Sequence, residues 1–171
     1  MTELLYLPNP LLRQKAEKIF NVGDEELKIA EKMKEVMLRE PGVGLAANQI
    51  GILKKIITIF YIDQESKKEV NYSLFNPEII SYSKETVLME EGCLSLPEQF
   101  AEIERPKKIQ LRFLDTKNKL IHKEASGVEA RIIQHEIDHL YGKLFIDYLS
   151  PLKRNIIIKK VKKYLKNKID E

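Results

Sequence analysis

Hydrophobic residues recur at helical spacing in the first quarter of the chain. Four of them share one face of a helix: Leu27, Ala30, Met33 and Met37. Asp24 can cap the start of this helix, and Pro41 and Gly42 cannot continue it. The pattern therefore predicts a helix over residues 24–40.

Between residues 54 and 121 the pattern changes to short runs rich in β-branched and aromatic side chains. Four of these runs predict strands, at residues 56–62, 72–75, 85–89 and 108–114. Turn-forming residues separate them, notably Asn76 with Pro77 and the segment 115–118.

A second helix is predicted directly after these strands. Residues 126–129, Ser-Gly-Val-Glu, match a capping box, and Gly142 lies just past the last turn. One face of this helix carries Val128, Ile132, His135 and His139, so two imidazoles emerge from an otherwise apolar, inward-facing stripe. A third helix begins at residues 150–151, where serine is the cap and proline lies in the first turn.

The two histidines of the second helix, His135 and His139, flank Glu136. Residues four apart stack on one helix face and can reach a single ion, with Glu136 near a water bound to that ion. The single cysteine, Cys93, follows Glu91 in a glycine-containing turn and could supply a third ligand. Three protein ligands on a tetrahedral ion leave one position for water, and this arrangement suits hydrolysis.

Each of these residues also has a simpler interpretation. The histidines could have ordinary core or surface roles, and Cys93 could be a small buried side chain or a nucleophile activated by a histidine. Ligation is favoured because two histidines spaced for a metal ion would attract the thiolate, which the ion deprotonates outright. The remaining histidine, His122, lies in a polar segment typical of a surface strand.

The order of the elements is helix, strands, helix, helix, which indicates an α+β fold. We expect short antiparallel β-sheets packed around a central metal-binding helix, with a basic helix at the C-terminal end. No repeat, low-complexity tract or linker divides the sequence, so we expect residues 1–171 to form a single domain.

A segment of small residues, 41–49, ends on the amide side chain of Gln49. It is not a phosphate-binding loop, because no Lys-Ser/Thr pair follows its glycines. It could be a flexible loop, or it could allow a ligand to approach the backbone beside that amide. Glu91, Asp138 and Arg105 could orient the ligating histidines, with Asp138 and Arg105 as a pair, although each could equally be a solvated charge.

Taken together, three segments resemble the peptide deformylase family. Its motifs Gly-x-Gly-Leu-Ala-Ala-x-Gln, Glu-Gly-Cys-x-Ser and Gln-His-Glu-x-Asp-His match residues 42–49, 91–95 and 134–139, in the family's order. The resemblance implies co-translational removal of the formyl group from the N-terminal formyl-methionine of nascent polypeptides, with release of formate. It also implies that Cys93, His135 and His139 hold one metal ion per chain, typically Fe(II), with Zn, Ni or Co also able to occupy the site.

The resemblance implies further roles around this ion. Glu136 would be the general base and then the general acid, and Gln49 and the backbone N–H of Leu94 would stabilise the oxyanion. The substrate-binding residues that it implies are Val43, Gly44, Met89, Glu91, Val128, Arg131 and Ile132. Arg131 and Phe100 differ from the residues of better-known members, which leaves the rim and the side-chain preference of the pocket open.

The composition is that of a soluble globular protein, with 43% hydrophobic and 32% charged residues. The longest apolar runs are far too short to span a bilayer, and the start of the chain lacks the features of a secretory signal. One cysteine cannot form an internal disulfide, which fits a reducing compartment. We therefore expect a cytoplasmic monomer without a membrane partner.

Positive charge is concentrated at the C-terminal end of the sequence. Residues 151–171 hold eight basic and two acidic residues, whereas the whole chain has 29 basic and 26 acidic residues. Apolar residues alternate with the lysines, so the segment predicts a helix docked by its apolar side with a solvated charged face. The family resemblance suggests contact with ribosomal RNA through this helix, and both interpretations can hold together.

Two other functions are compatible with parts of the pattern. The H-E-x-x-H motif also marks metalloproteases, but these usually recruit a third ligand downstream, and no histidine follows His139. A ribosome-binding or RNA-binding protein with a structural ion would usually close the site with four protein ligands, and three are evident.

Overall fold

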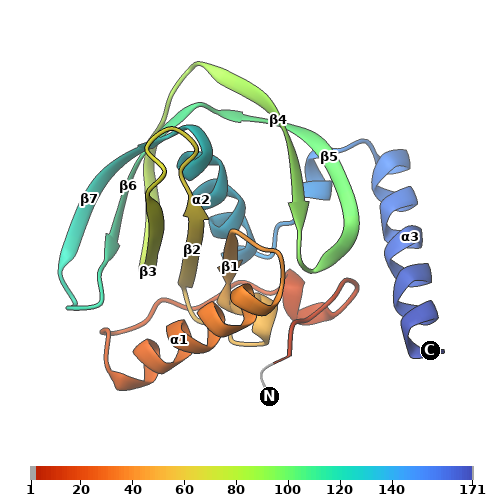
Figure 1. Ribbon diagram of the computed structural model, residues 1–171, viewed down its shortest axis with the longest axis horizontal. Coiled ribbons are helices and arrows are strands. Elements are labelled where there is room, and N and C mark those ends of the chain that lie inside the picture. Colours follow the sequence, from red (N-terminus) through yellow and green to blue (C-terminus); the bar gives the residue numbers. More distant parts are fainter. Residues whose placement is uncertain (1–2, 171) are drawn as a thin grey trace.

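The computed structural model describes residues 3–170. Its elements, in chain order, are η1 (Pro10–Arg13), α1 (Asp24–Arg39), β1 (Gly44–Ala46), η2 (Ala47–Ile50), β2 (Ile56–Ile62), β3 (Glu69–Tyr82), β4 (Thr86–Cys93), β5 (Leu96–Pro106), β6 (Lys108–Leu114), β7 (Leu120–Ser126), α2 (Gly127–Leu140), η3 (Phe145–Tyr148) and α3 (Pro151–Ile169). This arrangement confirms the α+β class and the C-terminal basic helix (Figure 1).

Within residues 3–170 the strands form two antiparallel sheets. The larger sheet has the order β1-β2-β3-β6-β7, and the smaller sheet pairs β4 with β5. Helix α2 lies between the two sheets, and its residues Ile132, Ile133 and Ile137 share a hydrophobic cluster with Ile57 and Leu74 of the larger sheet (Figure 1). This packing places the inward face of α2 beside the end of β4.

Helix α1 packs on the same sheet through a second hydrophobic cluster. Met33, Val36 and Met37 of this helix are buried against Ile56 and Phe75 of β2 and β3. The helix leads directly into the loop before β1, so it sets the position of the small-residue segment 41–49.

Two predicted strands are reproduced and two others are longer than predicted. Strands β2 and β6 have the predicted bounds, whereas β3 continues through Asn76 and Pro77, which we had expected to form a turn. Asn76 has a φ of 51°, and the pairing with β6 shifts register between Phe75 and Glu78. The Asn76 amide accepts from Ile19 N–H at 2.8 Å and donates to its carbonyl at 2.9 Å, so a bulge anchored to the N-terminal segment replaces the turn.

The predicted cap of the first helix is wrong, whereas the second helix has Ser126 at its cap position, as predicted, but lacks the capping box. Before α1 the cap position is Gly23, whose N–H donates to the Glu26 carboxylate at 3.1 Å, and Asp24 is the first helical residue. Before α2 the Ser126 side chain makes no capping hydrogen bond. The other partner of the expected box, Glu129, instead accepts from a tyrosine of β3 and pairs with a lysine of β7.

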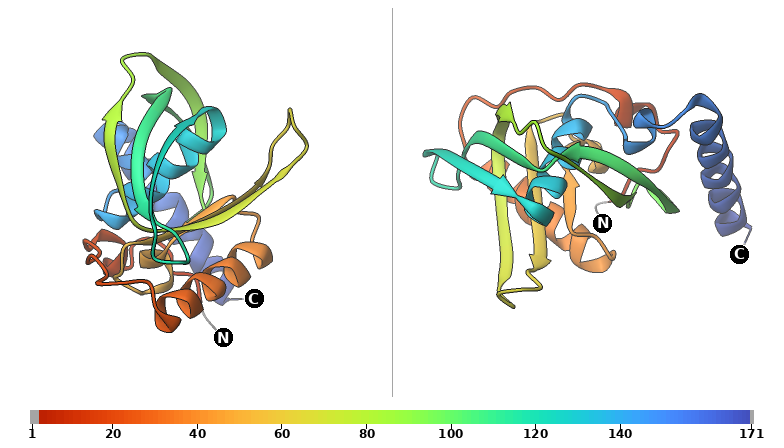
Figure 2. Two further views of the ribbon diagram at one scale, coloured as in Figure 1. Left: turned by 90° about the vertical axis from the view of Figure 1, so that its left-hand side faces the viewer. Right: turned by 90° about the horizontal axis from the view of Figure 1, so that it is seen from above.

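Helix α3 begins as predicted, because the Ser150 hydroxyl accepts from the Lys153 N–H at 3.3 Å. It lies at the end of the molecule opposite β7, beside β5 (Figure 2). Its residues Ile157 and Val161 are buried with Leu7 and Phe145 in a third hydrophobic cluster. No helix of the described part of the chain is long and apolar enough to cross a membrane.

Candidate active site

Three potential metal ligands come together where β4 meets α2. The ligand atoms of Cys93, His135 and His139 all lie within 4.8 Å of one another, and Sγ of Cys93 is 3.3 Å from Nε2 of His139. Cys93 ends β4 at the point where its pairing with β5 shifts register after Gly92. The sequence predicted this trio. His135 and His139 lie on one face of α2, and the fold brings Cys93 to that face although it is 42 positions before His135 in the sequence.

The hydrogen bonds of His135 leave Nε2 as its potential ligand atom. Nδ1 of His135 is 2.8 Å from the Glu91 carboxylate, which can only accept when ionised, so Nδ1 carries a proton. Burial lowers the pKa of His135, but hydrogen bonds with Cys93 and Glu91 outweigh it and raise that pKa well above its ordinary value, so a bound cation would take the place of the Nε2 proton. Burial and the neighbouring charge of His135 lower the pKa of His139 well below its ordinary value, which keeps that ring neutral. One sulfur and two imidazole nitrogens form a donor set that suits a transition-metal ion.

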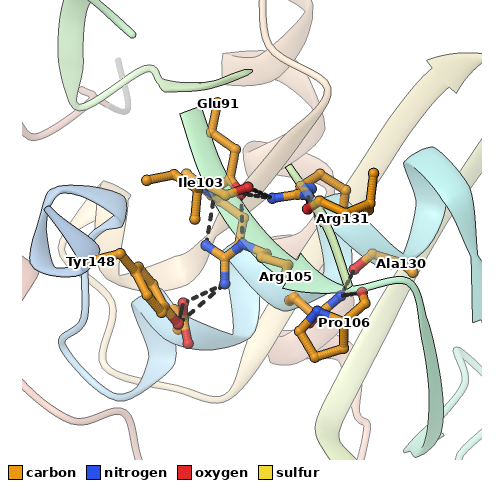
Figure 3. Close-up of polar contacts among 11 residues, drawn as sticks. Glu91, Ile103, Arg105, Pro106, Ala130, Arg131 and Tyr148 are labelled. Atoms are coloured by element: carbon orange, nitrogen blue, oxygen red, sulfur yellow. Dashed lines mark hydrogen bonds and ion pairs between the residues drawn. The ribbon is translucent and has the colours of Figure 1, made fainter. Parts of the chain in front are cut away.

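Glu91 is the centre of a buried ionic network with Arg105 and Arg131 (Figure 3). Its carboxylate accepts from Arg105 Nε and Nη2 at 2.6 and 2.9 Å and from Arg131 Nη1 at 2.7 Å. Burial by itself raises the pKa of Glu91, but the hydrogen bonds from His135 and Arg105 outweigh it and bring that pKa well below its usual range. Glu91 therefore remains ionised and fixes the orientation of His135.

Arg105 extends this network to the far side of the site. Its Nη1 donates to Asp138 at 2.8 Å, so the predicted pair is present, and the Tyr148 hydroxyl also donates to Asp138 at 2.8 Å. Figure 3 shows Arg105 between Glu91 and Tyr148. The Arg105 guanidinium also lies 4.8 Å from the Tyr148 ring centroid. Arg105 is therefore held from three sides, which restrains Glu91 in turn.

Arg131 and Phe100 occupy different environments at the rim. The Arg131 guanidinium is buried and donates to Glu91, to the Ile103 carbonyl and to the Val87 carbonyl, each at 2.7 Å. Its charge is therefore satisfied by the protein interior. Phe100 is 63% exposed. Its ring lies directly over Gly92, because a Cβ at Gly92 would be only 2.6 Å from a ring carbon of Phe100.

Glu136 is a buried carboxylate next to the three potential ligands. Burial raises its pKa to about 7, and its Oε2 has no hydrogen-bond partner within residues 3–170. Gly44 lies against it, because a Cβ at this position would be 2.6 Å from Oε1 of Glu136. Such a carboxyl group can both accept and release a proton near neutral pH.

Gln49 is held in one orientation on η2. Its Oε1 accepts from the Ala46 N–H at 2.9 Å, and its Nε2 donates to the Ser95 hydroxyl at 3.1 Å and approaches Sγ of Cys93 at 3.5 Å. No role of Ser95 was predicted from the sequence. Its place in the Glu-Gly-Cys-x-Ser motif, two residues after Cys93, was the available signal.

A cleft of about 530 Å³ opens beside these side chains. Its walls include all the residues for which the sequence suggested catalysis or substrate binding: Val43, Gly44, Gln49, Met89, Glu91, Leu94, Val128, Arg131, Ile132 and Glu136. Cys93 and His135 also reach its surface. His122 lies on β7 opposite Arg112 and takes no part in the site, as its polar surroundings suggested.

The group of Cys93, His135 and His139 could hold a metal ion, beside a carboxyl group of raised pKa and an open cleft. Within the described residues this group contains three side chains, whereas closed structural zinc sites usually have four protein ligands. The fold and the site define the class of metal-dependent hydrolases.

Comparisons with known proteins give a more specific result. The sequence model of the family described as "Polypeptide deformylase" matches residues 1–155. The peptide deformylase of Pelagibacter ubique (strain HTCC1062) is 49% identical over 166 residues, which cover 97% of this chain and 96% of that protein. The crystal structure of peptide deformylase from Ehrlichia chaffeensis has a TM-score of 0.93 and 34% identity, over 99% of both chains.

A crystal structure of the Ehrlichia chaffeensis enzyme in complex with actinonin has a TM-score of 0.90 and 36% identity, and covers 96% of this chain and 97% of that chain. The chain therefore belongs to the polypeptide deformylase family. It is a hydrolase that removes the formyl group from the N-terminal formyl-methionine of nascent polypeptides.

Proposed function

We propose that Cys93, His135 and His139 hold one catalytic metal ion, Fe(II) in the native enzyme, with Zn, Ni or Co as possible substitutes. The observation that carries this proposal is the convergence of their ligand atoms within 4.8 Å, beside Glu136. When bound, the ion supplies Lewis acidity, which polarises the formyl carbonyl and lowers the pKa of water.

Glu136 acts as general base and then as general acid. It accepts a proton from the attacking water and delivers it to the leaving amine, which departs poorly without protonation. Two features support this role: the pKa of its buried carboxyl group is raised to about 7, and its Oε2 has no partner within the described residues.

Gln49 and the backbone N–H of Leu94 stabilise the oxyanion. The contacts of Gln49 with Ala46 and Ser95 support this role, because they direct its NH₂ group toward the side of Cys93 without requiring a change of protonation. Loss of one such preorganised donor typically raises a barrier by about 2.7–4 kcal/mol.

The peptide binds in an extended conformation between two strand edges. β1 is an edge strand of the larger sheet, and β4 is paired with β5 on one side, so both can add a strand. Val43 and Gly44, just before and at the start of β1, line the cleft on one side, and Met89 and Glu91 of β4 line it as well. Val128, Ile132 and the stem of Arg131 border the pocket for the methionine side chain: these three residues come from one face of α2.

The direct test is anaerobic purification, metal analysis and a formate-release assay on formyl-Met-Ala-Ser. We expect about one bound ion per chain and formate release that is lost on chelation and restored by Fe(II). Internal cleavage of casein without formate release would contradict this function and favour a protease.

We also propose that the exposed lysines of α3 contact the ribosome. Lys159, Lys160 and Lys163 are exposed on a helix whose other side is buried by Ile157 and Val161. Replacing the three lysines by alanine should weaken co-sedimentation with ribosomes, most clearly at low salt, because phosphate contacts are strongly salt-dependent. Unchanged co-sedimentation would contradict this contact.

We further propose that the enzyme is a single-domain monomer that acts in the cytoplasm. Every residue proposed for catalysis comes from one copy of the chain, drawn from η2, β4, the turn after β4 and α2, which supports a single catalytic domain that acts as a monomer. Formyl-methionyl peptides arise during synthesis, and the single cysteine suits a reducing compartment, so we propose that the enzyme acts in the cytoplasm.

A further inference from the structure

The cleft extends beyond the catalytic residues to an outer region formed by segments far apart in the sequence. Four side chains line this region: Tyr6, Glu40, Tyr164 and Lys168. Two of them belong to the last turns of α3, which lies beside β5 at one end of the molecule (Figures 1 and 2). The C-terminal helix therefore forms part of the cleft as well as packing on the core.

The backbone holds Tyr6 next to the catalytic residues. Leu5 N–H donates to the Gln49 carbonyl at 2.7 Å, and Leu7 N–H donates to the Ser95 carbonyl at 3.0 Å. These two hydrogen bonds lie on either side of Tyr6 in the sequence and tie its backbone to Gln49 and Ser95, both of which are next to Cys93. The outer region is thus continuous with the site where the formyl group is cleaved.

The packing of α3 on the core fixes the positions of Tyr164 and Lys168. Val161 is fully buried, and Leu165 packs against the same cluster. Tyr164 and Lys168 are four residues apart and share one face of the helix, with Nζ of Lys168 5.1 Å from the Tyr164 ring centroid. The pKa of Lys168 is raised, chiefly by a hydrogen bond with Tyr164.

Lys168 differs from the other cation of the cleft. Arg131 is paired with Glu91 and its guanidinium is satisfied internally. Within residues 3–170 Lys168 makes no ion pair of the kind that holds Arg131, and its electrostatic neighbours are Tyr164, Tyr6 and the carboxylate of Glu40, which attracts it. An exposed ammonium beside phenol rings can bind a carboxylate and can donate to the carbonyl groups of an extended peptide.

The family's sequence model ends at residue 155, before Tyr164 and Lys168. We propose that these two residues form an outer subsite that binds the downstream part of the peptide substrate and favours an acidic residue there. This inference rests on the proposed function, because it assigns the subsite to the same formyl-methionyl peptides. Tyr164 supplies a surface for the peptide chain, and Lys168 supplies the charge selectivity.

The test measures kcat and KM for two peptides, formyl-Met-Ala-Ser-Glu-Ser and formyl-Met-Ala-Ser-Lys-Ser. We expect the wild type to prefer the glutamate peptide by about threefold in kcat/KM, the range of an exposed charge pair. Lys168→Glu should reverse this preference through KM. The matched control is Lys166→Glu, which makes the same charge change at an exposed position of α3 that does not line the cleft and should keep the wild-type ratio.

A second variant tests the other member of the subsite. Tyr164→Ala should raise KM for both pentapeptides by about the same factor while Tyr164→Phe restores it. A Lys168→Glu enzyme with the wild-type ratio, or a Lys166→Glu enzyme with an equal reversal, would overturn the subsite while leaving formate release intact. Wild-type enzyme that releases no formate from either peptide, with Fe, Zn, Ni or Co, would overturn the proposed function and the subsite together.

Discussion

Glu91 accepts a 2.8 Å hydrogen bond from Nδ1 of His135, although the two residues are 44 positions apart in the sequence. Two arginines, Arg105 and Arg131, hold the same carboxylate from β5 and α2. A single ionised group therefore couples the position of a proposed metal ligand to the packing of β4 and β5. The ring orientation of His135 depends on this coupling.

Replacing this carboxylate by an amide should weaken both metal binding and folding. In Glu91→Gln the charges of Arg105 and Arg131 lose their buried partner, so we expect the free energy of unfolding to fall by about 3–5 kcal/mol. Metal affinity should fall by about 10- to 100-fold, because His135 loses its orienting acceptor. Denaturant unfolding and metal titration measure the two effects.

The neighbouring Glu90 provides the control for this variant. Its side chain is exposed, so Glu90→Gln removes the same charge outside the network and should leave metal affinity unchanged. Equal metal affinities in the Glu91 and Glu90 variants would show that the network does not orient His135.

Glu136→Gln should remove turnover without removing the ion. The amide keeps the size of the side chain but cannot accept and return a proton, so kcat should fall by about a hundredfold to ten-thousandfold. Metal content, measured by atomic emission on the same preparation, should match that of the wild type. If the variant retained wild-type kcat, Glu136 would not be the base.

Gly44→Ala should impair catalysis through crowding. A Cβ at this position would lie 2.6 Å from Oε1 of Glu136 and 2.8 Å from Cγ2 of Ile132, closer than van der Waals contact allows. The displaced carboxylate should lower kcat, and the crowding should cost about 1–3 kcal/mol of stability. Gly23→Ala is the control, because its nearest contact would be an ordinary 3.5 Å from Glu26. An equal kcat in both variants would contradict this contact.

Alanine substitutions at two glycines with positive φ, Gly127 and Gly142, should distinguish the cost of backbone strain from the cost of steric crowding. Gly142 has a φ of 71°, and a Cβ there would collide with the backbone of Arg13, whereas Gly127 has a φ of 58° and no atom within 4 Å of such a Cβ. Alanine at Gly127 should cost about 1–2 kcal/mol from strain alone. Alanine at Gly142 should cost more, and thermal denaturation of both variants would show the difference. Equal losses would indicate that the segment at Arg13 moves aside.

The pattern of hydrophobic residues was sufficient to predict the bounds of some strands but not of others. β2 and β6 are continuous apolar or alternating runs, and their bounds were predicted. β5 was missed, and β7 was indicated only by the polar, strand-like segment around His122, because charged and polar residues occupy their exposed positions and resemble a loop without knowledge of a partner strand. The bulge at Asn76 depends on Ile19, 57 positions away, and no local pattern shows such a contact.

The catalytic centre was more predictable than its surroundings. The spacing of His135 and His139 on one helix face follows from local geometry, and the motif around Cys93 identified the third member. Tyr6, Tyr164 and Lys168 were not predicted as parts of the cleft, because long-range packing of α3 and the N-terminal segment brings them there. Such residues carry no local signature.

The central claim is that one sulfur and two imidazoles hold the ion and leave room for further ligands. X-ray absorption spectroscopy at the metal edge of anaerobically purified enzyme measures this ligand set directly. We expect one sulfur scatterer and two imidazoles together with at least one light oxygen ligand, and loss of the sulfur signal in Cys93→Ala. A spectrum without sulfur, or one with four protein ligands and no oxygen, would contradict the claim.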